Sequence, residues 1–327
     1  MTHETSAASR PQADLHVVVG AGPIGSGIAQ ALVAQGQRVR VVTRSGSGPE
    51  GIERVAADAA DQAALIAATK GAAVIYNCAN PPYHRWPELW PPIARSLLGA
   101  AQSADAVLVT ISNLYGYGPA SRSIGQPGYD IGHPMTEQTP LAATGPKGRV
   151  RAQMWRDALA AHEAGRLRAV EVRGSDYVGP GANAVLGDRV VPRVLKGQAV
   201  TMIGRTDRAR TWTFTGDMVT MAITAGRDPM AWGRAWHVPS GPPRTQRQVV
   251  SDLASAAGVK QVPVRALPAS VLFAAGVVSP LMRELRETEY QFRQDFVMDG
   301  SAAAETFGLE PASWDFVAEK ILSSYRD

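Results

Sequence analysis

The sequence predicts an α/β fold built on a doubly wound parallel sheet, followed by a smaller C-terminal substrate-binding part. Residues 15–45 read as strand, glycine-rich turn, helix and strand. As far as residue 173, short apolar runs then alternate with longer helical patterns, which is typical of a parallel sheet with helices on both faces. The 327 residues are also enough to bury a large core.

The glycine-rich turn follows the first strand, over residues 16–19, and has the pattern G-x-G-x-x-G. Such a turn lets the backbone approach a pyrophosphate, and the N-terminus of the next helix supplies free N–H groups. An empty fold with a tight turn is the alternative. We interpret the segment as the dinucleotide-binding turn of a Rossmann fold. Its expected cofactor contacts are Gly20, Gly22, Pro23, Ile24 and Gly25.

The end of the second strand indicates which dinucleotide binds. NAD sites usually have an Asp or Glu there to hold the ribose hydroxyls. This chain has Thr43, Arg44 and Ser45 instead, and its next acidic residue is Glu50. The planar, permanently charged guanidinium of Arg44 suits a 2′-phosphate. We therefore expect NADPH or NADP, with a solvated Arg44 as the alternative.

Two further strand ends offer cofactor contacts. A weak third strand ends at Asp58, whose carboxylate could reach the adenine amino group or instead cap the next helix. The fourth strand, residues 72–78, is followed by Ala79 and Asn80. They lie at the carboxyl edge of the sheet, where open α/β sheets bind ligands. An aromatic and basic loop, residues 83–86, comes next.

A fifth strand over residues 106–111 leads into the segment S-N-L-Y-G-Y-G-P. This segment resembles the Ser-rich strand end and V-Y-G motif of extended short-chain dehydrogenases/reductases, the epimerase/dehydratase branch. With Tyr117 aligned to the tyrosine of that motif, Asn113 takes the place of the family's catalytic Ser or Thr, directly after Ser112.

The resemblance covers nearly the whole chain after the first 14 residues. The sixth strand, residues 168–173, is followed by G-S-D-Y-V-G-P-G, which resembles the family's R-P-x-x-V-Y-G-P. In T-W-T-F-T-G-D-M, Asp217 takes a usual acidic position ahead of a helix. The glycine motif departs from the family's G-x-x-G-x-x-G, because Val19 takes its first position.

The family's active pair, Tyr-x-x-x-Lys, is absent. In that pair the tyrosine donates a proton to a carbonyl, while the lysine lowers its pKa and holds the nicotinamide ribose. The best register puts Gly145 at the tyrosine position and Arg149 at the lysine position, with Lys147 out of register. Arg149 could bind ribose but cannot carry a proton at neutral pH. A surface arginine near the start of a helix over residues 150–164 is the alternative.

Substitute donors are expected at the end of the fifth strand, and we take Ser112, Asn113 and Tyr117 as the catalytic candidates. Tyr115 and Tyr177 are further possible donors. His133 lies in a Gly-rich loop that could fold over the site, or it is an ordinary loop histidine.

Composition restricts the partners. The net charge of +4 is scattered, which argues against nucleic acid. Cys78 is the only cysteine, which fits a reducing cytoplasm. We see no metal-binding pattern, no apolar signal region and no membrane-length apolar run. The sequence thus predicts a cytoplasmic monomer or homodimer with a small-molecule substrate, no metal and no membrane.

We divide the chain into a flexible tail (1–14), an NADP-binding Rossmann domain (15–180) and a substrate-binding part (181–327), of which about 233–240 returns to the main sheet. An apolar helical segment over residues 272–290 could form a substrate wall or simply pack in the core.

Three functions remain open. The first is an NADPH-dependent ketoreductase for a hydrophobic, aromatic polyketide-like ketone whose own phenol polarises the carbonyl. In lacking the pair, the chain resembles atypical reductases of aromatic polyketide antibiotics. The second is a non-catalytic NADP-sensing regulator. The third is a sugar-nucleotide epimerase or dehydratase, which the loss of the Tyr/Lys proton shuttle counts against. We favour the first.

Overall fold

A seven-stranded parallel sheet forms the centre of the computed structural model, which describes residues 14–119, 132–182, 185–267 and 287–326. The strand order is β11-β6-β5-β4-β1-β2-β3. In chain order these strands are β1 (Leu15–Val19), β2 (Arg38–Thr43), β3 (Glu53–Ala56), β4 (Ala72–Asn77), β5 (Val107–Asn113), β6 (Arg168–Gly174) and β11 (Arg234–His237). The order reverses between β1 and β4, as in doubly wound sheets, so the predicted α/β fold class is confirmed.

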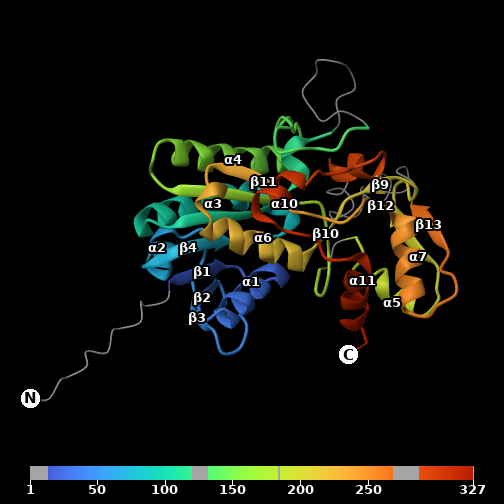
Figure 1. The fold of residues 1–327 in the computed structure, drawn as a ribbon. Helices are drawn as coiled ribbons and strands as arrows, with labels where there is room; N and C mark the ends of the chain where they lie inside the picture. Colours follow the sequence, from blue (N-terminus) through green and yellow to red (C-terminus); the bar gives the residue numbers. More distant parts are fainter. Residues whose placement is uncertain (1–13, 120–131, 183–184, 268–286, 327) are drawn as a thin grey trace, which may run out of the picture.

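Helices cover both faces of the sheet (Figure 1). On one face these are α2 (Gln62–Thr69), α3 (Trp86–Ala104) and α4 (Pro146–Glu163). On the other they are α1 (Pro23–Ala34), α6 (Thr215–Arg227) and α10 (Ser301–Phe307). Burial on both faces explains the continuous apolar sequence of β1, whose five residues are all buried.

A smaller C-terminal part lies at one end of these layers (Figure 1). Its strand pairs are β7 (Asp176–Val178) with β10 (Trp212–Phe214), β9 (Ala209–Arg210) with β12 (Arg244–Thr245), and β8 (Val200–Ile203) with β13 (Val264–Leu267). Its helices are α5 (Val191–Leu195), α7 (Gln246–Ala256) and α11 (Trp314–Ser323). Short 3₁₀ helices occur at η1 (Tyr83–Arg85), η2 (Leu114–Tyr117), η3 (Pro229–Ala231) and η4 (Glu289–Phe292).

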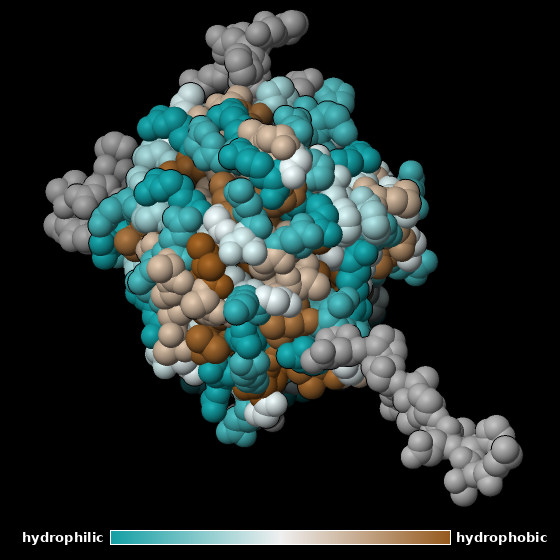
Figure 2. Space-filling view, turned by 90° about the vertical axis from the view of Figure 1, so that its left-hand side faces the viewer, coloured by the Kyte–Doolittle hydropathy of each residue, from teal (hydrophilic) through white to brown (hydrophobic). Residues whose placement is uncertain are grey.

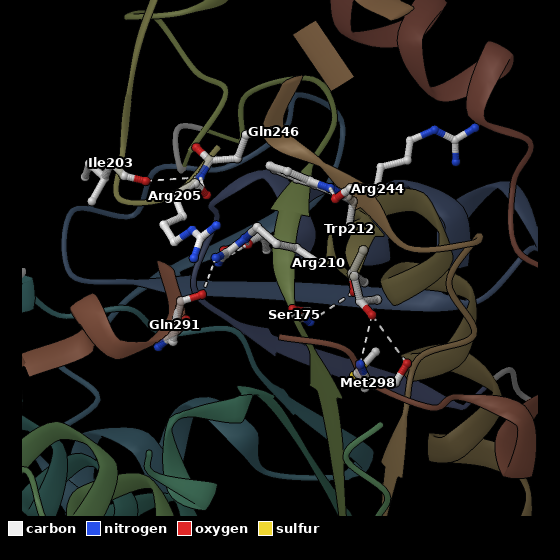
Figure 3. Close-up of polar contacts among 12 residues, drawn as sticks. Ser175, Ile203, Arg205, Arg210, Trp212, Arg244, Gln246, Gln291 and Met298 are labelled. Carbon is white, nitrogen blue, oxygen red and sulfur yellow. Dashed lines mark hydrogen bonds and ion pairs between the residues drawn. The ribbon is translucent and has the colours of Figure 1, made fainter. Parts of the chain in front are cut away.

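Residues 287–299, which we call the crossing segment, connect the two parts. Met298 forms a β-bridge with Met135 beside the main sheet, and Phe296 forms one with Arg210. Arg210 is completely buried. Its guanidinium pairs with Asp176 and donates to the Gln291 carbonyl oxygen, toward which it points in Figure 3. The crossing segment is thus fixed against both the sheet and the C-terminal part.

Two helices begin earlier than the sequence predicts. We expected a helix from residue 93, but α3 starts at Trp86 and contains Pro91 and Pro92. The helix predicted from residue 150 starts at Pro146, because proline fits the first helical position, where its missing N–H costs nothing. Most of the predicted tail (1–14), of the predicted loop over 125–134 and of the predicted helix over 272–290 lies outside the described residues.

The face shown in Figure 2 mixes hydrophilic and hydrophobic residues. Large exposed hydrophobic side chains in the described chain are Val33, Met230 and Phe316. None of the helices that the structure describes has the length and hydropathy to cross a membrane. The same residues contain no group of three or more His, Cys, Asp or Glu placed to hold a metal ion.

Candidate functional site

The glycine-rich turn packs directly on the end of β4. Gly20 has a φ of +106°, and a Cβ there would lie 2.5 Å from the Cys78 carbonyl oxygen. A Cβ on Gly25 would lie 2.1 Å from the Gly20 carbonyl oxygen. Gly22 differs, because a Cβ built there meets nothing within 4 Å. The turn is therefore closed where it touches the sheet and open at Gly22, where a pyrophosphate would need to approach the backbone.

The N-terminus of α1 opens onto the same space. Gly22 is the N-cap residue and gives no side-chain hydrogen bond. Pro23 follows at the start of the helix, and Ile24 packs partly buried against the core. First-turn N–H groups without a side-chain cap, together with the helix dipole, suit a phosphate group. The residues present thus fit a bound dinucleotide.

The end of β2 forms a compact turn. The Thr43 hydroxyl donates to the Ser47 carbonyl oxygen at 2.9 Å. The Ser45 hydroxyl donates to the Ser47 hydroxyl at 2.9 Å. Arg44 lies exposed between them. Its guanidinium therefore faces solvent at the strand end predicted to select the cofactor.

Asp58 does not cap α2. Its carboxylate accepts a hydrogen bond from the Ala60 N–H at 2.9 Å. The N-cap is Asp61, whose carboxylate accepts from the Ala64 N–H at 3.0 Å. Asp58 lies too far ahead of the first helical residue, Gln62, for that role, so the capping alternative is wrong. The exposed carboxylate leaves contact with adenine as its proposed role.

The end of β4 holds a buried amide. Asn77 is 1% exposed, and its Oδ1 accepts from the Ala79 N–H at 3.3 Å. Its Nδ2 has no hydrogen-bond partner in the described structure. A buried donor without a partner is costly, so this group is suited to a ligand acceptor. Ala79 is half-buried and Asn80 exposed at the same edge.

The residues that we aligned with the missing pair do not face the core. Gly145 is the N-cap residue of α4. Arg149 is exposed and donates to the Thr144 carbonyl oxygen. The buried residues four apart are Lys147 and Arg151, which are 1% and 7% exposed. The pair that faces inward is therefore Lys147 and Arg151, each two residues after the position that we aligned with the family's pair.

Gly148 explains why the sequence misled us. We expected the helix to begin after it, at residue 150, yet it lies within α4, where a Cβ would be 2.5 Å from the Tyr115 carbonyl oxygen. Glycine is needed there for close approach of the helix to η2. The helical spacing of Ala152, Trp155 and Ala158, which are buried, could have indicated the inward face of α4. That spacing also places residue 151 on the same face.

Lys147 is held by two elements distant in sequence. Its backbone N–H donates to Glu287 Oε1 at 2.7 Å, and its Nζ donates to Glu287 Oε2 at 3.0 Å. The Nζ also lies 4.7 Å from the centre of the Tyr83 ring in η1, within the range of a cation–π interaction. A positive charge is thus fixed behind this ring.

Arg151 lies one turn further along α4. Its guanidinium stacks on Trp86 and Trp90, 4.5 Å from each ring centre. Its Nη1 donates weakly to the Ile111 carbonyl oxygen at 3.5 Å. Its buried Nε has no partner among the described residues. Burial lowers the pKa of Arg151 from its ordinary value, and the free donor makes it the better-placed candidate for the ribose contact predicted for Arg149.

A chain of hydroxyl groups lies beside Lys147. Tyr83 donates to the Tyr115 oxygen at 3.4 Å, and the Thr288 hydroxyl lies 3.3 Å from the Tyr83 oxygen. Burial raises the pKa of Tyr83 and raises that of Tyr115 well above its ordinary value. Both phenols therefore keep their protons at neutral pH. Since Tyr115 accepts from Tyr83, its own O–H remains able to donate elsewhere.

Tyr117 is not a catalytic candidate, contrary to our prediction. Its side chain is completely buried. Its hydroxyl accepts from Arg173 Nη1 at 2.7 Å and lies 2.6 Å from His237 Nε2. Burial is the main cause that raises its pKa to about 12. The sequence could not show that residues two apart in η2 point in different directions, with Tyr115 toward the site and Tyr117 into the core.

The other predicted donors are outside the lining of the cavity described below. Ser112 is 3% exposed, and its carbonyl oxygen accepts from the Tyr177 hydroxyl. The Asn113 side chain caps η2 by accepting from the Tyr115 N–H at 3.1 Å. Asn113 therefore fixes the backbone that carries Tyr115. His133 is exposed.

A cavity opens between η2, the start of α4 and the crossing segment. Its lining residues are Tyr115, Gly118, Pro119, Ala143, Thr144, Gly145, Gly148, Glu287, Thr288 and Tyr290. Asp217 lies elsewhere, with its carboxylate accepting from the Ala312 N–H. Tyr115 thus connects the hydroxyl chain to a space that a substrate could enter.

Comparisons with known proteins agree with this geometry. The model of the NAD dependent epimerase/dehydratase family matches residues 16–238, from β1 to the residue after β11. The chain belongs to this family. No curated protein sequence matched it.

Solved structures of epimerases and dehydratases share the fold. The dTDP-glucose 4,6-dehydratase of Bacillus anthracis str. Ames, in complex with NAD, has a TM-score of 0.76 at 16% identity, over 96% of this chain and 97% of that one. The UDP-glucose 4-epimerase of Thermus thermophilus, also in complex with NAD, has a TM-score of 0.73 at 19% identity, over 95% of this chain and 99% of that one. The UDP-glucose 4-epimerase of Thermotoga maritima, with UDP-glucose, has a TM-score of 0.74 at 17% identity, over 95% of this chain and 98% of that one.

Two basic residues lie on the inward face of α4. Lys147 and Arg151 occupy the inward positions four apart. A tyrosine is still present, but η2 supplies it as Tyr115, and η1 supplies Tyr83 between Tyr115 and Lys147. The Tyr115 phenol from η2, the Tyr83 phenol from η1 and the Lys147 ammonium from α4 therefore lie in one row of contacts.

Proposed function

We propose that the chain is an NADPH-dependent ketoreductase that reduces a carbonyl of a hydrophobic, aromatic ketone. One observation carries the proposal. Tyr115 lines the cavity, accepts a hydrogen bond from Tyr83, and has its own O–H left to donate. Reduction of a ketone places negative charge on the carbonyl oxygen, which requires such a donor.

The cofactor residues support this reading. The open space at Gly22 and the uncapped start of α1 fit a pyrophosphate. Arg44 is the proposed contact for the 2′-phosphate, and Arg151 the proposed contact for the nicotinamide ribose. Bound NADPH would supply the hydride.

The protein's part is to hold and protonate the carbonyl oxygen. Tyr115 donates its hydrogen bond to that oxygen and gives up its proton as the alkoxide forms. Tyr83 stabilises the resulting phenolate by donating to it. The Lys147 charge on the far side of the Tyr83 ring strengthens that donor. Asn113 keeps the η2 backbone in place.

Aromatic side chains around the site support a flat, apolar substrate. Tyr115 and Tyr290 line the cavity. Tyr83 and Trp86 pack edge to face, with ring centres 5.2 Å apart, directly behind Tyr115. Apolar cavities with a few placed polar groups are typical of sites for small hydrophobic molecules.

A sugar-nucleotide epimerase or dehydratase is the second candidate. The three structural relatives named above have this activity, and one of them contains UDP-glucose. Its support is the shared fold. Against it stands the lack of a base for the substrate hydroxyl, since buried phenols with raised pKa values are donors.

The test is an assay of aryl ketones with NADPH, with UDP-glucose and dTDP-glucose as parallel substrates. We expect NADPH oxidation with a ketone and no sugar-nucleotide conversion. Tyr115→Phe should lower kcat by about 10²–10⁴-fold. The control is Tyr325→Phe, since Tyr325 bonds Asp188 near the C-terminus, and it should retain activity. Conversion of a sugar nucleotide alone would overturn the proposal.

A smaller loss in Tyr115→Phe has its own meaning. If kcat fell less than about tenfold while NADPH bound normally, the protein would not supply the donor. A ketone whose neighbouring phenol polarises its own carbonyl would then explain the reaction. Comparing aryl ketones with and without that phenol separates the two mechanisms.

A further inference from the structure

We infer that Glu287 is a positioning residue of the site, whose carboxylate keeps the buried Lys147 ammonium charged and fixed against the Tyr83 ring. The inference rests on the proposed function, because it explains what keeps the Lys147 ammonium charged beside the hydroxyl groups of Tyr83 and Tyr115. Glu287 lies 140 positions from Lys147 in sequence and accepts from both of its nitrogens, at 2.7 and 3.0 Å.

Burial makes this carboxylate necessary. The Lys147 side chain is 2% exposed and that of Glu287 is 17% exposed. A lysine ammonium removed from water loses its proton unless an opposite charge compensates it. The groups that contact Lys147 include the Tyr83 ring from η1 and the Glu287 carboxylate from the crossing segment. Arg151, one turn on, adds a second positive charge to the same face of α4.

Gly145 makes room for the carboxylate. A Cβ at Gly145 would lie 2.4 Å from Glu287 Oε1, 2.7 Å from its Cγ and 2.9 Å from its Cδ. The N-cap of α4 has no side-chain hydrogen bond of its own, and Glu287 takes that place by accepting from the Lys147 N–H. A negative charge at a helix N-terminus is also favourable. The glycine and the glutamate therefore act together.

The chain is well suited to a direct test. It contains five lysines, and the other four, Lys70, Lys196, Lys260 and Lys320, are all exposed. An NMR titration of ¹³C-labelled lysine side chains should show one resonance that differs from the rest. Loss of that resonance in Lys147→Met assigns it. No substrate or cofactor is needed.

Three variants separate the charge from the fold. Glu287→Gln keeps the shape but removes the charge, and should lower the titration midpoint of Lys147 by about 1–3 pH units. Glu287→Asp keeps the charge and should restore part of the shift. Gly145→Ala retains both charged residues but pushes them apart, and should lower the midpoint as Glu287→Gln does. Glu289→Gln is the control, because Glu289 pairs with Arg293, and it should leave the midpoint unchanged.

The pH dependence of ketone reduction gives the second measurement. If the Lys147 charge supports Tyr83, the alkaline limb of the kcat profile should move to lower pH in Glu287→Gln, by the same amount as the NMR midpoint. An unchanged midpoint in Glu287→Gln would overturn the inference, even in an active reductase. If the midpoint shifts but the protein reduces no ketone, the inference about Glu287 holds and the proposed function is wrong. If Glu287→Gln fails to fold, Gly145→Ala decides the same question.

Discussion

Arg173 donates a hydrogen bond from Nη1 to the hydroxyl of Tyr117 at 2.7 Å, beneath the loop that carries the candidate site. The same guanidinium pairs with Glu171, and Tyr117 continues to His237 at 2.6 Å. The chain of contacts ends at the Asp299 carbonyl oxygen, which lies 2.8 Å from His237 Nδ1. This buried chain fixes Tyr117 at the end of η2, while Tyr115 is among the residues that line the cavity.

Tyr117→Phe should therefore lower stability rather than chemistry. Losing the hydroxyl leaves Arg173 and His237 with unsatisfied buried groups, which costs about 1–3 kcal/mol in free energy of unfolding. Urea unfolding measures this cost, and kcat under native conditions should fall far less than in Tyr115→Phe. A collapse of kcat at unchanged stability would show that Tyr117 takes part in the reaction.

His237 should make stability depend on pH. Burial, with a smaller effect from Arg173, lowers the pKa of His237 to about 3 from 6.5. Between these values the unfolded chain binds a proton that the folded chain does not, so stability falls as pH decreases below about 6.5. The slope from this group approaches about 1.4 kcal/mol per pH unit. His237→Gln should flatten the dependence between pH 7 and 5, whereas His84→Gln, at an exposed position, should not.

Arg44→Ala should reduce the preference for NADPH over NADH. A charge-assisted contact with the 2′-phosphate is worth about 1.5–3 kcal/mol, or roughly tenfold to a hundredfold in affinity. Titration of wild type and variant with both cofactors measures it, and affinity for NADH should barely change. Equal affinities in the wild type would contradict the choice of NADPH.

Gly22→Val and Gly25→Val should lose different properties, cofactor binding in the first and stability in the second. A side chain at Gly22 meets no protein atom within 4 Å, so this variant should fold normally yet lose cofactor binding. A Cβ at Gly25 would lie 2.1 Å from the Gly20 carbonyl oxygen, so that variant should unfold more readily. Thermal unfolding with and without NADPH distinguishes them. Normal NADPH binding by Gly22→Val would mean that the turn is only structural.

The sequence predicted the sheet and the glycine turn because their signals are local. Buried parallel strands such as β1 are almost continuously apolar, and Gly20, Gly22 and Gly25 form a contiguous motif. The start of α4 was harder, because Pro146 and Gly148 resemble a loop in sequence. The place of Gly148 in the helix depends on its close packing against the Tyr115 backbone.

The hydroxyl chain and the ion pair were beyond prediction from one sequence. Tyr83 meets Tyr115 across 32 positions and Thr288 across 205 positions. Lys147 meets Glu287 across 140 positions. No local spacing encodes such contacts, since they form only when η1, η2, α4 and the crossing segment pack together.

The crossing segment also sets an order of assembly during synthesis. The main sheet is complete at His237, and domains generally fold as units, N-terminal first, while translation continues. Glu287 and Thr288, which complete the surroundings of Lys147 and Tyr83, are translated about fifty residues later. A nascent chain can thus form the sheet and the glycine-rich turn while the surroundings of Lys147 and Tyr83 are still unfinished. The contacts of Glu287 and Thr288 with Lys147 and Tyr83 are therefore among the last parts of the cavity region to form.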